Sequence, residues 1–100
     1  MYISQVTFES DLEHREMIEG LMQSKKDAIE AAELVISSEV WWKEDSRSVG
    51  FVVVGKWHKK EDFQAWLKAI HPHGHKKRPL DAPPIRKTMA FYHSLPEHLQ

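Results

Sequence analysis

A short amphipathic helix directly after a long apolar stretch constrains the fold of this chain more than any other feature. Between Trp57 and Ile70, apolar side chains recur at helical spacing as Phe63, Trp66 and Leu67. The opposite face of this segment is charged or polar. Packing, rather than intrinsic propensity, stabilises a helix this short in water. The sequence therefore predicts that the helix lies on a sheet.

Four segments have the β-branched and aromatic content of strands. They span residues 2–8, 34–44, 49–57 and 85–95. The turn-forming residues 45–48 join the second and third segments into a hairpin. In the third segment both alternating sets of side chains are largely apolar, which is typical of a central strand that is covered on both faces.

The segment between the first two strands has the periodicity of a helix. Ser10 and Glu13 are spaced as in a capping box, which predicts a helix over residues 10–23. Ser24 resembles a second helix start, so we expect a break there and a short helical turn over 25–32. A stripe at helical spacing runs along the segment through Ile18, Leu21, Met22, Lys25 and Ile29.

The predicted order of elements is β-α-β-β-α-β, the ferredoxin-like pattern. We expect an α+β fold in which two helices cover one face of a four-stranded antiparallel sheet. A chain of 100 residues has the length of one domain, so residues 1–100 are assigned to a single domain.

Composition argues against several classes of protein. A net charge of −1 argues against a nucleic-acid binder. The chain has no cysteine, which excludes disulfides, thiolate metal ligands and a cysteine nucleophile. No apolar run approaches the length of a membrane span, and the N-terminus lacks a signal pattern. We therefore expect a cytoplasmic protein that does not associate with membranes.

Three histidines follow the second helix at alternate positions, His71, His73 and His75. Imidazole is a good ligand for iron, zinc or copper and can also act as a general base. Three interpretations remain open: a solvated polar loop, a single functional histidine, or a structural zinc site. Zinc would need a fourth ligand, for which Asp81 or His58 is available.

A basic cluster follows the histidines. It comprises Lys76, Lys77 and Arg78, with Arg86 and Lys87 further along. Such a cluster is either a solvated loop or a site that pairs with carboxylates of a bound ligand, to which Arg can donate two parallel hydrogen bonds.

Two adjacent tryptophans, Trp41 and Trp42, fall within the second predicted strand, so their side chains must point to opposite faces of the sheet. We expect one of them in the core and the other on the outer face. A tryptophan on an outer sheet face predicts a subunit interface.

The spacing of Trp57, Phe63 and Trp66, followed by His75, resembles the antibiotic biosynthesis monooxygenase (ABM) superfamily, and most of all its haem-degrading branch. The resemblance covers roughly residues 29–76. It implies a homodimer in which two sheets pack face to face into an α+β barrel. It also implies that Trp66 walls a haem pocket and that His75 ligates the haem iron, with His71 and His73 as competitors.

The resemblance extends to further residues of a haem site. Phe63 would line the pocket, and Arg78 would pair with the haem propionates. Haem degraders of this family carry an asparagine on the first strand, whereas this sequence contains none. Gln5 or Thr7 occupies that neighbourhood, and Gln5 is the residue expected near the distal side.

Three functions are compatible with this sequence. The first is an ABM-type monooxygenase that binds and degrades haem. The second is cofactor-independent oxidation of a quinol or phenol, with a loop histidine as general base. The third is a non-catalytic dimer that binds a small ligand or regulates a partner, because this fold hosts many functions.

Overall fold

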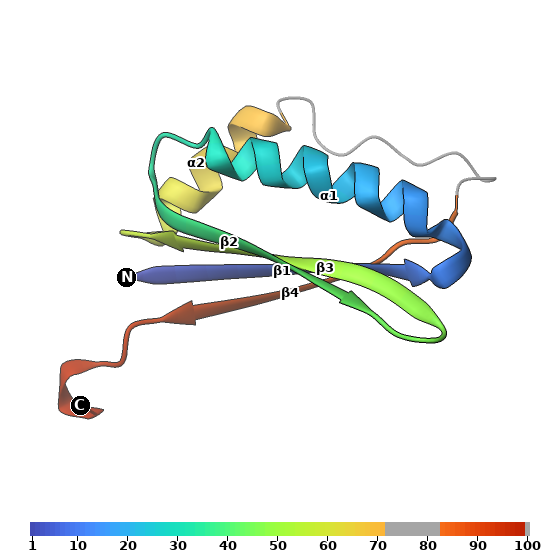
Figure 1. The fold of residues 1–100 in the computed structure, drawn as a ribbon. Helices are drawn as coiled ribbons and strands as arrows, with labels where there is room; N and C mark the ends of the chain where they lie inside the picture. Colours follow the sequence, from blue (N-terminus) through green and yellow to red (C-terminus); the bar gives the residue numbers. More distant parts are fainter. Residues whose placement is uncertain (72–82, 100) are drawn as a thin grey trace.

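The structure, a computed structural model, describes residues 1–71 and 83–99. Its elements follow in the order β1 (Tyr2–Asp11), the 3-10 turn η1 (Leu12–His14), α1 (Arg15–Glu30), β2 (Val35–Glu44), β3 (Ser48–Trp57), α2 (Lys60–Ile70), β4 (Arg86–His93) and the 3-10 turn η2 (Glu97–Leu99). The strands form one four-stranded antiparallel sheet in the order β2-β3-β1-β4. Both helices lie on the same face of this sheet (Figure 1). The predicted ferredoxin-like α+β fold is confirmed.

The core lies between this sheet face and the helices. Its buried side chains come from β1, α1, β3 and α2: Tyr2, Phe8, Ile18, Ile29, Val49, Phe51, Val53, Trp57 and Phe63. The central strand β3 contributes Val49, Phe51, Val53 and Trp57 at alternate positions, as the two-residue period of a strand requires. Within the described residues, no helix has the length and apolar character needed to span a membrane.

The first helix differs from its prediction at both its start and its middle. Pairing of Ser10 with Val49 extends β1 to Asp11, so the helix begins at Arg15 instead of residue 10. Ser10 is buried and its Oγ donates a hydrogen bond to the carbonyl oxygen of Pro84 at 2.7 Å, so it does not form the predicted capping box. The predicted break at Ser24 is also wrong, because α1 continues to Glu30 as one helix.

The two tryptophans of β2 lie on opposite faces of the sheet, but neither is in the core. Trp41 is paired with Val52 on the face away from the helices and is 59% exposed. Trp42 lies on the helix side and is 37% exposed, with the Arg15 guanidinium 5.7 Å from its ring centre. Since β2 is an edge strand, Trp42 packs at the margin of the helix layer. The fully buried tryptophan is instead Trp57.

Gly50 in β3 is required by a close approach of the neighbouring strand. A Cβ added there would lie 2.4 Å from the Phe8 carbonyl oxygen of β1, so the backbone would have to shift. We expect Gly50→Ala to lower the free energy of unfolding by about 1–3 kcal/mol, as overpacking does. Chemical denaturation followed by circular dichroism measures this change.

Gly20 provides the matched control for this prediction. It lies within α1, and a Cβ added there meets no atom within 4 Å. Gly20→Ala should therefore raise the free energy of unfolding by about 0.5–1 kcal/mol, because alanine favours helix more than glycine does. Equal effects of the two substitutions would show that steric crowding at Gly50 is not the cause.

Candidate functional site

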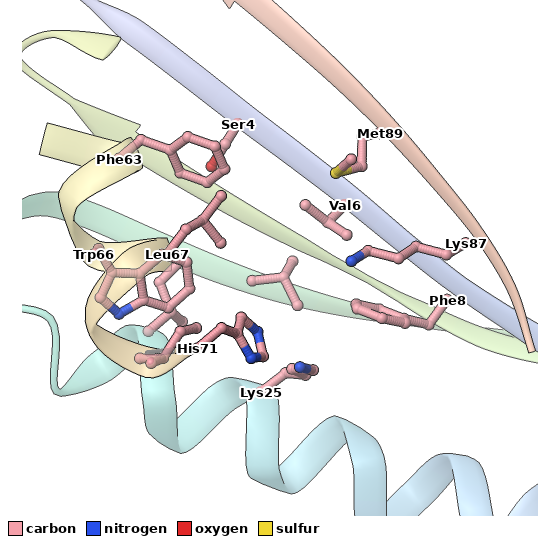
Figure 2. Close-up of a pocket in the computed structure, with 13 residues that line it drawn as sticks. Ser4, Val6, Phe8, Lys25, Phe63, Trp66, Leu67, His71, Lys87 and Met89 are labelled. Carbon is pink, nitrogen blue, oxygen red and sulfur yellow. The ribbon is translucent and has the colours of Figure 1, made fainter. Parts of the chain in front are cut away.

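A pocket lies between the two helices and the sheet, and its cavity volume is about 100 Å³. Figure 2 shows side chains from all three parts of the fold converging on it. The lining residues are Ser4, Val6 and Phe8 of β1, Lys25 and Ile29 of α1, Val53 of β3, Phe63, Trp66, Leu67 and Ile70 of α2, His71, and Lys87 and Met89 of β4. Most of this surface is apolar, so the pocket suits the body of an aromatic ligand.

Two sequence periodicities place these side chains together. In β1 the alternate residues Ser4, Val6 and Phe8 face the helices. In α2 the apolar stripe that begins at Phe63 faces the sheet, and every member of the stripe lines the pocket. Because Gln5 lies between Ser4 and Val6, its side chain points to the opposite face of the sheet. Gln5 does not line this pocket, and the distal role predicted for it stays a prediction.

An aromatic wall closes one side of the pocket. The ring of Trp66 lies 5.4 Å from that of Trp57 and 6.2 Å from that of Phe63, measured between ring centroids. Trp66 Nε1 donates a hydrogen bond to the carbonyl oxygen of Ala28 at 3.3 Å, which ties α2 to α1. Trp66 is half-buried, so it packs against the core and also walls the pocket. Phe63 is buried and also lines the pocket.

A buried hydroxyl group faces the pocket at the same end. Ser4 is only 2% exposed, and its Oγ accepts a hydrogen bond from Trp57 Nε1 at 3.1 Å. Gly55 makes this arrangement feasible, because an added Cβ would lie 2.9 Å from Trp57 Nε1 and 3.1 Å from Ser4 Oγ. Ser4 was not predictable from the sequence, because a serine in an apolar strand can either line a pocket or pack in the core.

Two lysines lie at the other end of the pocket, around the ring of Phe8. Lys25 Nζ is 5.5 Å and Lys87 Nζ 5.6 Å from the ring centroid. Burial, together with the positive charge of Lys87, lowers the pKa of Lys25 below its usual value. Lys25 was recognisable in the sequence as the one charged member of an otherwise apolar helical stripe. Lys87 was placed in a basic cluster, without a link to Lys25.

Of the three histidines in the 71–75 run, His71 lies in the described part of the chain and lines the pocket. It follows the last residue of α2, and its backbone N–H donates to the Leu67 carbonyl oxygen at 3.0 Å. His73, His75, Arg78 and Asp81 lie outside the described residues. Among residues 1–71 and 83–99, no group of three or more His, Asp or Glu side chains could hold a metal ion. The zinc interpretation therefore has no support in the described part of the chain.

Comparison with solved structures finds several similar chains. The haem degrader MhuD from Mycobacterium tuberculosis, with two haems bound in its active site, shares 18% identity at a TM-score of 0.57, over 95% of this chain and 97% of that one. An MhuD variant with two manganese protoporphyrin IX molecules per active site shares 19% identity at a TM-score of 0.56, over 95% of this chain and 96% of that one.

The third similar structure is a candidate antibiotic biosynthesis monooxygenase from Bacillus cereus. It shares 20% identity at a TM-score of 0.52, over 96% of this chain and 94% of that one. The chain shares the α+β fold of these three structures. The likeness spans nearly the whole of each chain, so it confirms at the level of the fold the resemblance that Trp57, Phe63 and Trp66 predicted.

Comparison with protein-family models and with curated proteins found no match. At 18–20% identity the solved structures establish the fold alone.

Proposed function

We propose that this chain is an ABM-type monooxygenase that binds haem in the pocket between its helices and its sheet, and degrades it. The observation that carries the proposal is the combination of an aromatic wall, a histidine and two cations around one apolar pocket. A structurally similar protein holds haem and is a haem degrader. Trp66 and Phe63 would contact the macrocycle, and the cations would face its propionates. Bound haem would supply the iron at which oxygen reacts.

The axial ligand would come from the histidine run after α2. The family resemblance assigns this role to His75. The position of His71 on the pocket lining supports it as a second candidate. Neutral imidazole ligates haem iron, and a backbone or carboxylate acceptor for its other nitrogen sets the tautomer.

We further infer that the protein is a homodimer that associates through the outer faces of its sheets. On that face Trp41 is 59% and Tyr92 50% exposed, and the neighbouring Val52 and Val54 are half-buried. Exposed large apolar side chains on a sheet mark an interaction surface. Pairing of two such faces would close the α+β barrel that the resemblance implies.

An absorption titration of the apo-protein with hemin tests the haem proposal. For the wild type we expect a saturable Soret band at about one haem per chain. Loss of the axial ligand should lower the affinity for haem at least about tenfold. The variants are His71→Ala and His75→Ala, and the one that loses the band identifies the ligand. His98→Ala is the control, because His98 is exposed in η2, away from the pocket lining.

Addition of a reductant such as ascorbate to the haem-bound protein then tests degradation. Loss of the Soret band with formation of an open-chain product would support it. If the wild-type protein forms no specific Soret band, the haem proposal is wrong. If the band forms but persists in the presence of reductant and oxygen, haem binding is supported and haem degradation is refuted.

The size of the cavity favours a second candidate function. A cavity of about 100 Å³ is nearer to one that holds a single benzene ring than to the volume of a macrocycle, so haem entry requires the pocket to widen. A single-ring phenol or quinol needs far less widening than haem does. His71 would then act as general base and remove the phenolic proton, after which the substrate carbanion reduces oxygen.

Oxygen uptake with phenolic substrates in metal-free buffer tests this second candidate. Activity that is abolished by His71→Ala and retained in His98→Ala would support it. If no phenolic substrate causes oxygen uptake and hemin gives a specific Soret band, the second candidate is refuted and the haem proposal is retained.

A further inference from the structure

Two ammonium groups from distant parts of the chain lie at one end of the pocket. Lys25 comes from α1 and Lys87 from β4, and Figure 2 shows both beside Phe8, away from Phe63 and Trp66. Each Nζ is within 5.6 Å of the Phe8 ring centroid. The ring face attracts both cations, but it does not neutralise them.

No carboxylate among the described residues pairs with either lysine. Three acidic residues nearby in sequence pair with other cations: Glu9 with Lys43 at 3.1 Å, Asp11 with Arg86 at 3.5 Å, and Glu30 with Lys26 at 3.0 Å. Burial first, and the positive charge of Lys87 second, lower the pKa of Lys25, so the two ammonium groups repel each other. An anion between them would relieve this repulsion.

We propose that Lys25 and Lys87 form a carboxylate-binding site, and that the ligand of this pocket is an aromatic molecule with an anionic group at one end. This inference deepens the proposed function and rests on it for the identity of the pocket. The two cations would fix the carboxylate, and the apolar lining between Val6 and Trp66 would take the ring. Charge-assisted hydrogen bonds give such a site both affinity and orientation.

The spacing of β1 indicates the length of ligand that such a site orients. Ser4 and Phe8 mark the two ends of the lining on this strand, and four residues of extended chain span roughly 13 Å. A single-ring aromatic acid held at the lysines would reach part of this distance, and a larger anionic ring system would reach all of it. Haem carries two propionates, so the same chemistry is shared by haem and by small phenolic acids.

The experiment compares a carboxylate with its neutral isostere. Binding of 4-hydroxybenzoate and 4-hydroxybenzamide is measured by NMR titration on the wild type, Lys25→Met, Lys87→Met and the double variant. Methionine keeps the length of the aliphatic chain and removes the charge. Lys26→Met is the matched control, because Lys26 is the neighbouring lysine of α1, pairs with Glu30, and does not line the pocket.

We expect the wild type to bind the acid at least about tenfold more tightly than the amide, which corresponds to about 1.4 kcal/mol. Each single substitution should reduce this preference, and the double substitution should abolish it. Lys26→Met should retain the wild-type preference. Equal affinity for acid and amide in the wild type, a preference that survives the double substitution, or no binding of either compound would overturn the proposal for small ligands.

A second arm uses hemin and hemin dimethyl ester, in which the propionate charges are removed. Tighter binding of hemin, lost in the double variant, is expected. If the two bind equally with a specific Soret band, the proposed haem function stands and the carboxylate site is refuted. If neither binds while 4-hydroxybenzoate shows the charge-dependent preference, the carboxylate site stands and the haem function is refuted.

Discussion

Replacing Trp57 by alanine is expected to lower the free energy of unfolding by about 3–5 kcal/mol, the range for truncating a large aromatic side chain in a core. Trp57 is fully buried, and its ring lies against Phe63 at 5.7 Å and Trp66 at 5.4 Å between centroids. The substitution also removes the Nε1–H donor to the buried Ser4 hydroxyl. Domains of this size are stable by only about 5–15 kcal/mol, so the loss would take much of the total.

Chemical denaturation monitored by circular dichroism measures the effect, with two comparison variants. Trp57→Phe keeps an aromatic ring and removes the hydrogen bond. Its free energy of unfolding should therefore lie between those of Trp57→Ala and the wild type. Trp42→Ala should cost about 1 kcal/mol or less, because Trp42 is partly exposed and contacts Arg15 through a cation–π interaction. A loss at Trp57 no larger than that at Trp42 would refute the central packing role of Trp57.

Substituting Val52 by aspartate is expected to convert the proposed homodimer to a monomer. Val52 lies on the outer face of the central strand β3, between Trp41 of β2 and Thr7 of β1. In a two-fold interface the substitution buries two uncompensated charges, one from each subunit. We expect the dissociation constant of the dimer to rise at least about 100-fold, or about 2.7 kcal/mol. Analytical ultracentrifugation over a range of protein concentrations measures this change.

The control places the same charge on the other side of the molecule. Ser24 is exposed on α1, so Ser24→Asp should leave the oligomeric state unchanged. Circular dichroism checks that Val52→Asp retains its fold, because Val52 is half-buried and not a core residue. A wild-type protein that sediments as a monomer at all concentrations, or a Val52→Asp variant that remains dimeric, would contradict association through this face.

The two substitutions probe opposite faces of one sheet. Trp57 and the pocket lie on the helix side, whereas Val52 and Trp41 lie on the outer side. In the proposed dimer each subunit contains a pocket of its own, so dissociation of the dimer should leave the pocket lining intact. Hemin binding by the monomeric variant would separate ligand binding from assembly.

Local periodicity was sufficient to predict the elements and their order. Strand alternation and the helical stripe of α2 depend on residues close in sequence, and they correctly placed Phe63 and Trp66 facing the sheet. The start of α1 was not predictable in this way. Ser10 and Glu13 satisfy the capping-box pattern, but cross-strand pairing of Ser10 with Val49 keeps this segment in β1. Pairing between β1 and β3, which are distant in sequence, outweighed the local preference for a helix start.

The lysine pair was decided by the tertiary structure alone. Lys25 and Lys87 are far apart in sequence, and only the packing of α1 over a sheet that ends in β4 brings both to the Phe8 ring. The register of β1 likewise turned Ser4 toward the pocket and Gln5 away from it, because neighbouring residues of a strand face opposite sides. The sequence by itself determined the elements, their order and the apolar face of α2, since these depend on local spacing. The composition of the pocket depends on contacts between distant segments, which only the folded chain brings together.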